Sequence, residues 1–143
     1  MIHFQLVSLA GLKFDDDVYE VILPTMDGQI GVLDHHMPLV SVATTGAIAV
    51  RRKSSDPDDF MEYFAVSGGV IEVSNNVLTV LVDDADHADE ISEAEAQKAF
   101  ELAVKMKTEA KDQVSLDNAQ SLMDRHATRL QVAGLKRRHR RQG

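Results

Sequence analysis

Cysteine is absent from the 143-residue sequence. A chain without thiols cannot form a disulfide framework, use a thiol nucleophile or build a thiolate zinc site. Long apolar runs are absent as well, so we expect no transmembrane helix and no direct insertion into a membrane. The first ten residues hold no Lys or Arg, and residues 15–20 are mostly acidic. We therefore expect neither a secretory signal nor an organellar transit peptide.

Basic residues are scarce in the first part of the chain. Residues 1–90 contain four Lys and Arg against sixteen Asp and Glu, a net charge of −12, whereas residues 91–143 contain eleven against seven, a net charge of +4. This asymmetry predicts two modules with different roles. The first module would repel phosphates, so we expect no nucleic-acid binding there.

Short apolar runs bounded by turn residues dominate the first module. Asn75 and Asn76 suit a tight hairpin turn because Asn tolerates positive φ, and Gly68 with Gly69 predicts a sharp bend between two strands. Many short strands with turns about every ten residues indicate a β-sandwich or flattened barrel. The expected strands are residues 2–9, 18–23, 29–33, 39–43, 47–53, 60–67, 70–73 and 77–82.

The second module has the pattern of a helical hairpin. Ser92 and Glu95 form a capping box at the start of the first helix, and residues 115–118 can cap the second. The apolar stripe of the first helix is Ala96, Ala99, Ala103, Met106 and Ala110, and that of the second is Leu116, Ala119, Met123, Ala127 and Leu130. An alanine-rich seam buries little area, so we expect the hairpin to depend on docking elsewhere and to move.

Catalytic motifs are missing from the sequence. His35 and His36 are adjacent on an extended segment, so their rings point to opposite sides and we expect no metal site. The acidic run at residues 83–90 lacks the glycine of a calcium loop and is interpreted as a solvated linker. No phosphate-binding loop, dinucleotide fingerprint or nucleophile elbow is present. An interaction or regulatory protein is therefore favoured over an enzyme.

The chain carries a basic cluster at residues 136–141. Five of these six residues are Lys or Arg. The cluster could bind an acidic protein surface, nucleic acid or anionic lipid, or it could be a solvated tail.

Residues 23–39 strongly resemble a signature of the epsilon subunit of F-type ATP synthases. A Gly-x-x-Gly turn at Gly28 and Gly31 is followed by a His-x-Pro-Leu segment that begins at His36. Three further segments match in family order, at residues 64–73, 88–91 and 129–133. The resemblance runs along nearly the whole chain.

The resemblance implies a ten-stranded β-sandwich over residues 1–88 and an antiparallel two-helix hairpin over residues 89–143. It implies a central-stalk subunit with no catalytic role of its own, which couples ion-driven rotation of the c-ring through the gamma subunit to ATP synthesis. Asp27, Gln29 and Ile30 would contact the c-ring, and His36 and Pro38 the gamma subunit. Many relatives carry an acidic residue in place of Gln29, whose amide could instead form a hydrogen bond. The protein would lie on the cytoplasmic face of a bacterial inner membrane, in preference to a plastid thylakoid.

The hairpin resembles the element with which this family inhibits ATP hydrolysis. In its extended state it would enter the alpha/beta hexamer, with the basic tail facing acidic segments of the beta subunits. The tail arginines are Arg137, Arg138, Arg140 and Arg141.

Some relatives bind ATP in the folded hairpin. In this chain Arg125 and Arg129 match two of the arginines of that site, but Ser92 stands in place of an Asp and Glu95 in place of an Arg. The sequence therefore predicts no cofactor. The alternative is a stand-alone ATP-sensing module that uses Arg125 and Arg129.

Overall fold

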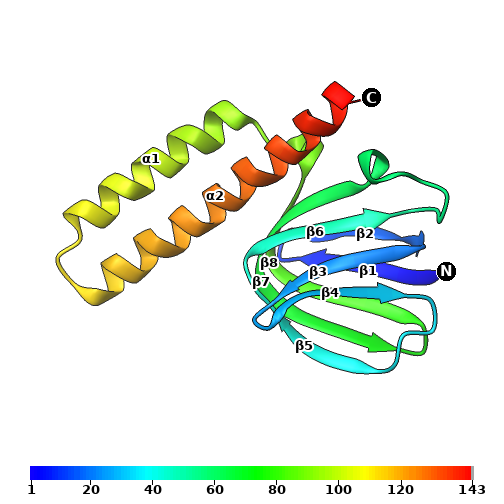
Figure 1. The fold of residues 1–143 in the computed structure, drawn as a ribbon. Helices are drawn as coiled ribbons and strands as arrows, with labels where there is room; N and C mark the ends of the chain where they lie inside the picture. Colours follow the sequence, from blue (N-terminus) through cyan, green and yellow to red (C-terminus); the bar gives the residue numbers. More distant parts are fainter. Residues whose placement is uncertain (143) are drawn as a thin grey trace.

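A computed structural model describes the backbone of residues 1–142 and the side chains of residues 1–136. Strands fill the first part of the chain and helices the second (Figure 1). The strands are β1 (Ile2–Ser8), β2 (Gly11–Val18), β3 (Glu20–Thr25), β4 (Gly28–Leu33), β5 (Leu39–Ala43), β6 (Gly46–Arg51), β7 (Glu62–Ser74) and β8 (Val77–His87). The helical elements are the 3-10 turns η1 (Asp58–Phe60) and η2 (Ala88–Glu90) and the helices α1 (Glu93–Glu109) and α2 (Gln113–Gln142).

The strands form one sheet that closes on itself. Seven strands follow the order β2-β1-β8-β7-β5-β3-β4, and β6 pairs with β3 and β7. All pairs are antiparallel except that of β1 with β8. Because both β5 and β6 bridge β3 and β7, the sheet folds into a flattened sandwich. The predicted β-sandwich followed by a two-helix hairpin is confirmed, with eight strands in place of about ten.

Alternate side chains of the strands fill the sandwich core. Phe4 and Phe64 are the largest fully buried side chains, and the ring of Phe14 lies between them, 5.2 Å and 5.9 Å from their ring centroids. The described members of this cluster all come from residues 2–85. The sandwich therefore has an apolar core of its own, to which the hairpin contributes nothing.

The strand prediction missed β2. Its only buried side chains are Phe14 and Val18, so the run of three aspartates between them conceals the alternation of a strand. Pairing with β1 stabilises it, because His3 of β1 lies 2.6 Å from Asp15 and 2.7 Å from Asp17. These two hydrogen bonds raise the pKa of His3 above its usual value. Cross-strand pairing thus overrides the low strand propensity of aspartate.

The prediction also divided β7 into two strands at its glycine pair, which was wrong. β7 continues through both glycines, and its pairing with β8 keeps one register from Ser67 opposite Asp84 to Gly69 opposite Val82. Gly69 is needed for a close approach of the two strands, since a Cβ there would lie 2.0 Å from the carbonyl oxygen of Leu81. The glycines bend the strand without ending it.

The acidic run at residues 83–90 is not a solvated linker. Its first five residues complete β8, and Ala88–Glu90 form η2. Ala85 is buried in the core, and Asp84 and Asp86 on either side of it are only partly exposed. The run was misinterpreted because the carboxylates of Asp84 and Asp86 form ion pairs with arginines of α2.

The two helices begin at side-chain caps. Ser92 caps α1 by accepting a hydrogen bond from the Glu95 amide, as predicted. Asp112 caps α2 by accepting one from the Ser115 amide at 2.7 Å, so this helix begins earlier than predicted. That amide lowers the pKa of Asp112.

The seam between the helices is narrower than the predicted stripes. Ala96, Ala103 and Ala119 are buried, whereas Met106 is 47% exposed and Ala127 is exposed. The helices therefore approach closely through alanines and bury little apolar area.

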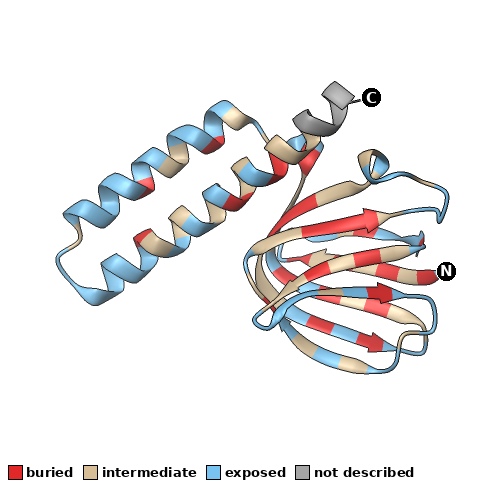
Figure 2. Ribbon diagram, viewed as in Figure 1, coloured by how far each residue is buried: buried red, intermediate tan, exposed pale blue. Residues whose placement is uncertain are grey.

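The hairpin rests on the sandwich through α2. This helix contacts β7, β6 and both 3-10 turns, and α1 lies on its far side (Figure 1). Val132 packs against Ala65 and Ala88 in a small second apolar cluster. Most of α1 and the tip of the hairpin are exposed (Figure 2). Within residues 1–142, no helix is long and apolar enough to cross a bilayer.

Candidate functional site

The turn between β3 and β4 and the first residues of β4 hold the residues expected to contact the c-ring. Thr25 Oγ1 donates a hydrogen bond to the Gly28 carbonyl at 2.6 Å, and Gly28 adopts a φ of 110° that favours glycine. Asp27 and Gln29 are exposed, whereas Ile30 is partly buried against the sandwich core. A hydrogen bond therefore stabilises this polar turn, and of the three predicted contact residues only Asp27 and Gln29 are exposed to a partner.

The loop between β4 and β5 holds the residues expected to contact gamma. His36 Nδ1 donates a hydrogen bond to the Met37 carbonyl at 2.8 Å, and Pro38 is exposed. The His35 side chain is 84% exposed. The two rings are therefore used differently, although His35 has a φ of 57° in a turn and does not lie on the expected extended segment. Within residues 1–136, no group of three or more His, Asp or Glu side chains is arranged to hold a metal ion.

Asn76 anchors the β4–β5 loop from the β7–β8 turn. Its side chain accepts a hydrogen bond from the His35 amide at 2.8 Å. It also donates to the Met1 carbonyl at 3.0 Å and to Asp34 at 2.9 Å. The Asn76 bond and the nearby N-terminal amine hold the pKa of Asp34 below its usual value. One side chain therefore fixes the N-terminus and the His35 loop together.

Replacing Asn76 with Gly should destabilise the fold by about 1–3 kcal/mol, because three hydrogen bonds are lost. Asn75 is the matched control, since it has a φ of 52° beside the 62° of Asn76 and Gly tolerates both. Asn75→Gly should change the unfolding free energy by less than about 0.5 kcal/mol. Urea unfolding measures both variants, and equal losses would refute the anchoring role.

An exposed apolar row crosses five neighbouring strands on the outside of the sandwich. Strand pairing aligns Val42 of β5, Val70 of β7, Leu81 of β8, Val7 of β1 and Leu12 of β2. Directly paired residues project to the same face of a sheet. Four of the five side chains are 46–58% exposed, and Val7 is partly buried. We call these five residues the outer apolar row.

The outer apolar row could not be predicted from the sequence pattern. Each of its residues lies in or beside a run that reads as core, as Leu81 does between the buried Val80 and Val82. Only the pairing register shows that the five residues share one outward face. The row is a surface of the kind that binds another protein, since monomers rarely expose a contiguous apolar band.

Arginines of α2 pair with aspartates of β8. Arg125 lies 3.4 Å from Asp84 and Arg129 lies 3.3 Å from Asp86, and Lys136 pairs with Asp89 of η2. We call these three contacts the docking ion pairs. The two arginine pairs hold by charge more than by hydrogen bonding, because Nε of each arginine is buried with no hydrogen-bond partner among the described residues. The two arginines considered for ATP phosphates are thus held by carboxylates.

Arg129→Gln should weaken docking of the hairpin by about 1 kcal/mol, or about fivefold, because the pair with Asp86 is only partly exposed. Hydrogen exchange of the α2 amides measures the effect, and a double-mutant cycle with Asp86→Asn isolates the pair. Lys98→Gln on the exposed side of α1 is the control and should have no effect. Additive effects of the two single changes would show that the pair contributes nothing.

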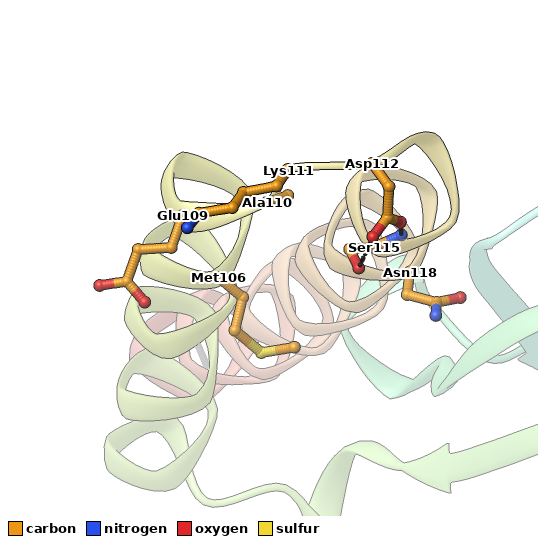
Figure 3. A pocket seen from close by; sticks show the side chains of 7 residues that line it. All are labelled: Met106, Glu109, Ala110, Lys111, Asp112, Ser115 and Asn118. Carbon is orange, nitrogen blue, oxygen red and sulfur yellow. Dashed lines mark hydrogen bonds between the residues drawn. The ribbon is translucent and has the colours of Figure 1, made fainter.

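A shallow pocket lies at the tip of the hairpin (Figure 3). Met106 of α1 points into the space between the helices, toward Ser115 and Asn118 of α2, whereas Glu109 points away from α2 and Asp112 precedes it in the connecting turn (Figure 3). The Ser115 hydroxyl donates to Asp112 at 3.2 Å, so these two groups serve the helix cap. All five side chains are exposed, and none is positioned against a nucleophile or base. The pocket therefore has no arrangement suited to catalysis.

Comparison with known sequences agrees with this organisation. The beta-sandwich domain profile of ATP synthase delta/epsilon chains matches residues 1–88. The chain is 33% identical over 141 residues to the ATP synthase epsilon chain of Chloroflexus aggregans, covering 99% of this chain and 98% of that one. It is 34% identical over 132 residues to the epsilon chain of Lactobacillus delbrueckii subsp. bulgaricus, covering 90% of both chains.

Solved structures share the fold. A chain of the Euglena gracilis mitochondrial ATP synthase, in an OSCP/F1/c-ring structure, superposes with a TM-score of 0.76 at 20% identity over 94% of this chain and 81% of that one. A chain of the Tetrahymena thermophila central stalk/c-ring structure gives 0.58 at 12% identity over 92% and 95%. From the profile and the full-length relatives, the chain belongs to the family of F-type ATP synthase epsilon subunits.

Proposed function

We propose that this subunit is part of the central stalk, where it joins the c-ring to gamma and does no chemistry itself. The observation that carries the proposal is the outer apolar row, which offers a band of contact across five strands. Packing against a partner would remove this band from water. The Tetrahymena neighbour comes from a structure described as central stalk/c-ring, which supports this assignment.

Two partners fit the two ends of β4. Asp27 lies in the turn before this strand and Gln29 and Ile30 in its first half, whereas the loop with His36 and Pro38 follows it. The six residues of β4 span about 20 Å at the usual strand rise, so the two ends are well separated. We assign the first end to polar loops of the c-ring and the second, with the outer apolar row, to gamma.

Rotation of the c-ring would then pass through this subunit to gamma and drive ATP synthesis. The subunit would be held by its partners on the cytoplasmic face of a bacterial inner membrane. We treat residues 1–88 as the rotor-foot domain and residues 89–143 as the regulatory domain. Separate clusters for the sandwich core and for the α2 contact support this division.

The hairpin would act as a brake on ATP hydrolysis. Its docked form depends on the docking ion pairs and on a small apolar cluster, so release costs little and an extended form could enter the alpha/beta hexamer. Arg137, Arg138, Arg140 and Arg141 lie outside the described side chains. Their proposed contact with acidic beta-subunit segments rests on charge alone.

ATP hydrolysis by an alpha-beta-gamma assembly tests both roles. The assembly is measured alone, with the full chain, and with a chain of residues 1–89, whose sandwich keeps its own core. Both chains should co-purify with gamma, and only the full chain should inhibit. Failure of either chain to bind gamma would refute the stalk assignment, and binding by both without inhibition would refute the brake. Full inhibition after changing the four tail arginines to Gln would exclude their role.

A further inference from the structure

A second row of paired residues lies beside the outer apolar row on the same face of the sheet. Strand pairing aligns Val40 of β5, Glu72 of β7, Thr79 of β8, Gln5 of β1 and Asp15 of β2. On the first four strands each of these residues lies two positions from a member of the outer apolar row, and such side chains share a face. The two rows are therefore about 7 Å apart, within reach of one partner segment.

The charged side chains along this second row are carboxylates, with one histidine beside them. Glu72 and Asp15 are exposed, and Asp17 follows on β2, opposite His3 of β1. Neither row contains Lys or Arg. Lys13 of β2 pairs with a carboxylate of η2 at 3.9 Å. One flank of the outer apolar row is thus negative, and we call Glu72, Asp15 and Asp17 the acidic border.

Glu72 carries its charge without a counterion. Its carboxylate is exposed and has no hydrogen bond or ion pair among the described residues, and its two cross-strand neighbours are uncharged. By contrast, His3 lies 2.6 Å from Asp15 and 2.7 Å from Asp17, and it offsets part of their charge when it is protonated. The acidic border is therefore most open to a positive partner at Glu72, two positions from Val70 of the outer apolar row.

Val40 connects this face with the β4–β5 loop that we assign to gamma. Its side chain is 75% exposed, and it lies two residues after Pro38 of that loop. The loop, the acidic border and the outer apolar row can therefore lie under one partner. A second copy of the chain is a poor occupant, because a symmetric contact would bring two acidic borders into one interface.

We propose that the gamma segment on this face is amphipathic and basic, with an apolar stripe against the outer apolar row and Lys or Arg side chains against the acidic border. This partner chemistry rests on the proposed binding of the row to gamma. The apolar contacts would supply most of the affinity, and the charges would orient the segment and speed its association. A segment with carboxylates at the same place would be repelled, so the border also selects the partner.

Salt should reveal the contribution of the acidic border, because ions screen exposed charges far more than they weaken apolar contacts. We expect gamma to bind the wild type about three- to tenfold more weakly at about 0.5 M salt than at about 0.05 M salt. A purely apolar contact would show little dependence on salt in this range.

Charge reversal at Glu72 tests the proposal in the full-length chain. Calorimetric titration with gamma at both salt concentrations gives the affinities, and urea unfolding checks the fold. Glu72→Lys should bind about tenfold more weakly at low salt, and most of this difference should disappear at high salt. Asp59→Lys in η1 is the matched control, because it makes the same change of charge on an element that contributes to neither row. It should change the affinity by less than about twofold.

Leu81→Glu separates this proposal from the binding of the row to gamma. If Leu81→Glu binds weakly but Glu72→Lys binds as the wild type does at low salt, the row contacts gamma and the basic segment is refuted. If both variants bind as the wild type does, the row is not the contact and both proposals fail. Equal losses for Glu72→Lys and Asp59→Lys would show an effect of net charge alone and would also overturn the proposal.

The basic cluster at residues 136–141 is the other source of positive charge in this chain. A chain of residues 1–89 lacks it and keeps the core of the sandwich. Glu72→Lys should weaken gamma binding of this shorter chain as it does in the full chain. An effect confined to the full chain would assign Glu72 to the tail, and a dimer of the free chain that Glu72→Lys alters would assign the face to a second copy. Either result would overturn the proposal.

Discussion

Gly69→Ala is expected to destabilise the sandwich by about 2–4 kcal/mol, since the added Cβ meets main chain and not a flexible side chain. The Cβ would lie 2.0 Å from the Leu81 carbonyl oxygen and 2.9 Å from Val82 Cγ1. β7 is bonded to β5 and β6 on one side and to β8 on the other, so it cannot move away without breaking ladder hydrogen bonds. The melting temperature should fall by about 2–4 °C per kcal/mol.

Gly31→Ala is the matched control for this substitution. Gly31 also lies in a strand, but its Cβ would have no neighbour closer than 3.9 Å, the Glu20 carboxylate oxygen. Alanine there should be neutral or stabilise by a few tenths of a kcal/mol, because it restricts the unfolded chain. Thermal and urea unfolding of both variants measure the difference. Losses within 1 kcal/mol of each other would show that β7 and β8 can separate at Gly69.

Elements with strict alternation could be predicted from the sequence at their true bounds. The strand Leu39–Ala43 is an example, since exposed and less exposed side chains alternate along all five residues. β2 was missed because two buried side chains in eight residues give no detectable period. It is held by pairing with the preceding strand β1, and local propensity carries no information about that pairing.

The docking ion pairs could have been found only after the length of β8 was known. Asp84 and Asp86 are two residues apart on a strand, and Arg125 and Arg129 are four apart on a helix. These spacings are about 6.7 Å and 6 Å, so the two pairs can form together. With the strand expected to end at residue 82, the acids were predicted to be solvated, so no pairing with the helix arginines was predicted. A run of like charges conceals a strand when each charge has a distant counterion.

The predicted contact loops came from the family resemblance, and the structure adds their geometry. His36 bonds its own loop, and Ile30 is partly buried, so exposure alone would have selected Met26 and Met37 instead. Neither the family resemblance nor a local sequence pattern indicated the outer apolar row, because each of its five residues comes from a different strand. Register in the closed sheet decides which apolar side chain faces outward, and register is a tertiary property.

Leu81→Glu is expected to weaken binding to gamma by about thirtyfold or more while leaving the fold intact. Leu81 is central in the outer apolar row, with Val70 and Val7 as its paired neighbours. A carboxylate there would lose its water in the complex, and changes at the centre of an interface commonly cost 2 kcal/mol or more. Its side chain is 51% exposed in the free subunit, so the unfolding free energy should change by less than about 1 kcal/mol.

Met26→Glu makes the same kind of replacement at a more exposed site. Met26 lies in the β3–β4 turn and is 79% exposed. Because we assign this turn to the c-ring, the variant should bind gamma as the wild type does. Calorimetric titration of gamma with each variant gives the two affinities, and urea unfolding checks the fold. Equal affinities for Leu81→Glu and the wild type would remove the outer apolar row from the gamma interface, and the assignment of the stalk contact would then rest on the β4–β5 loop alone.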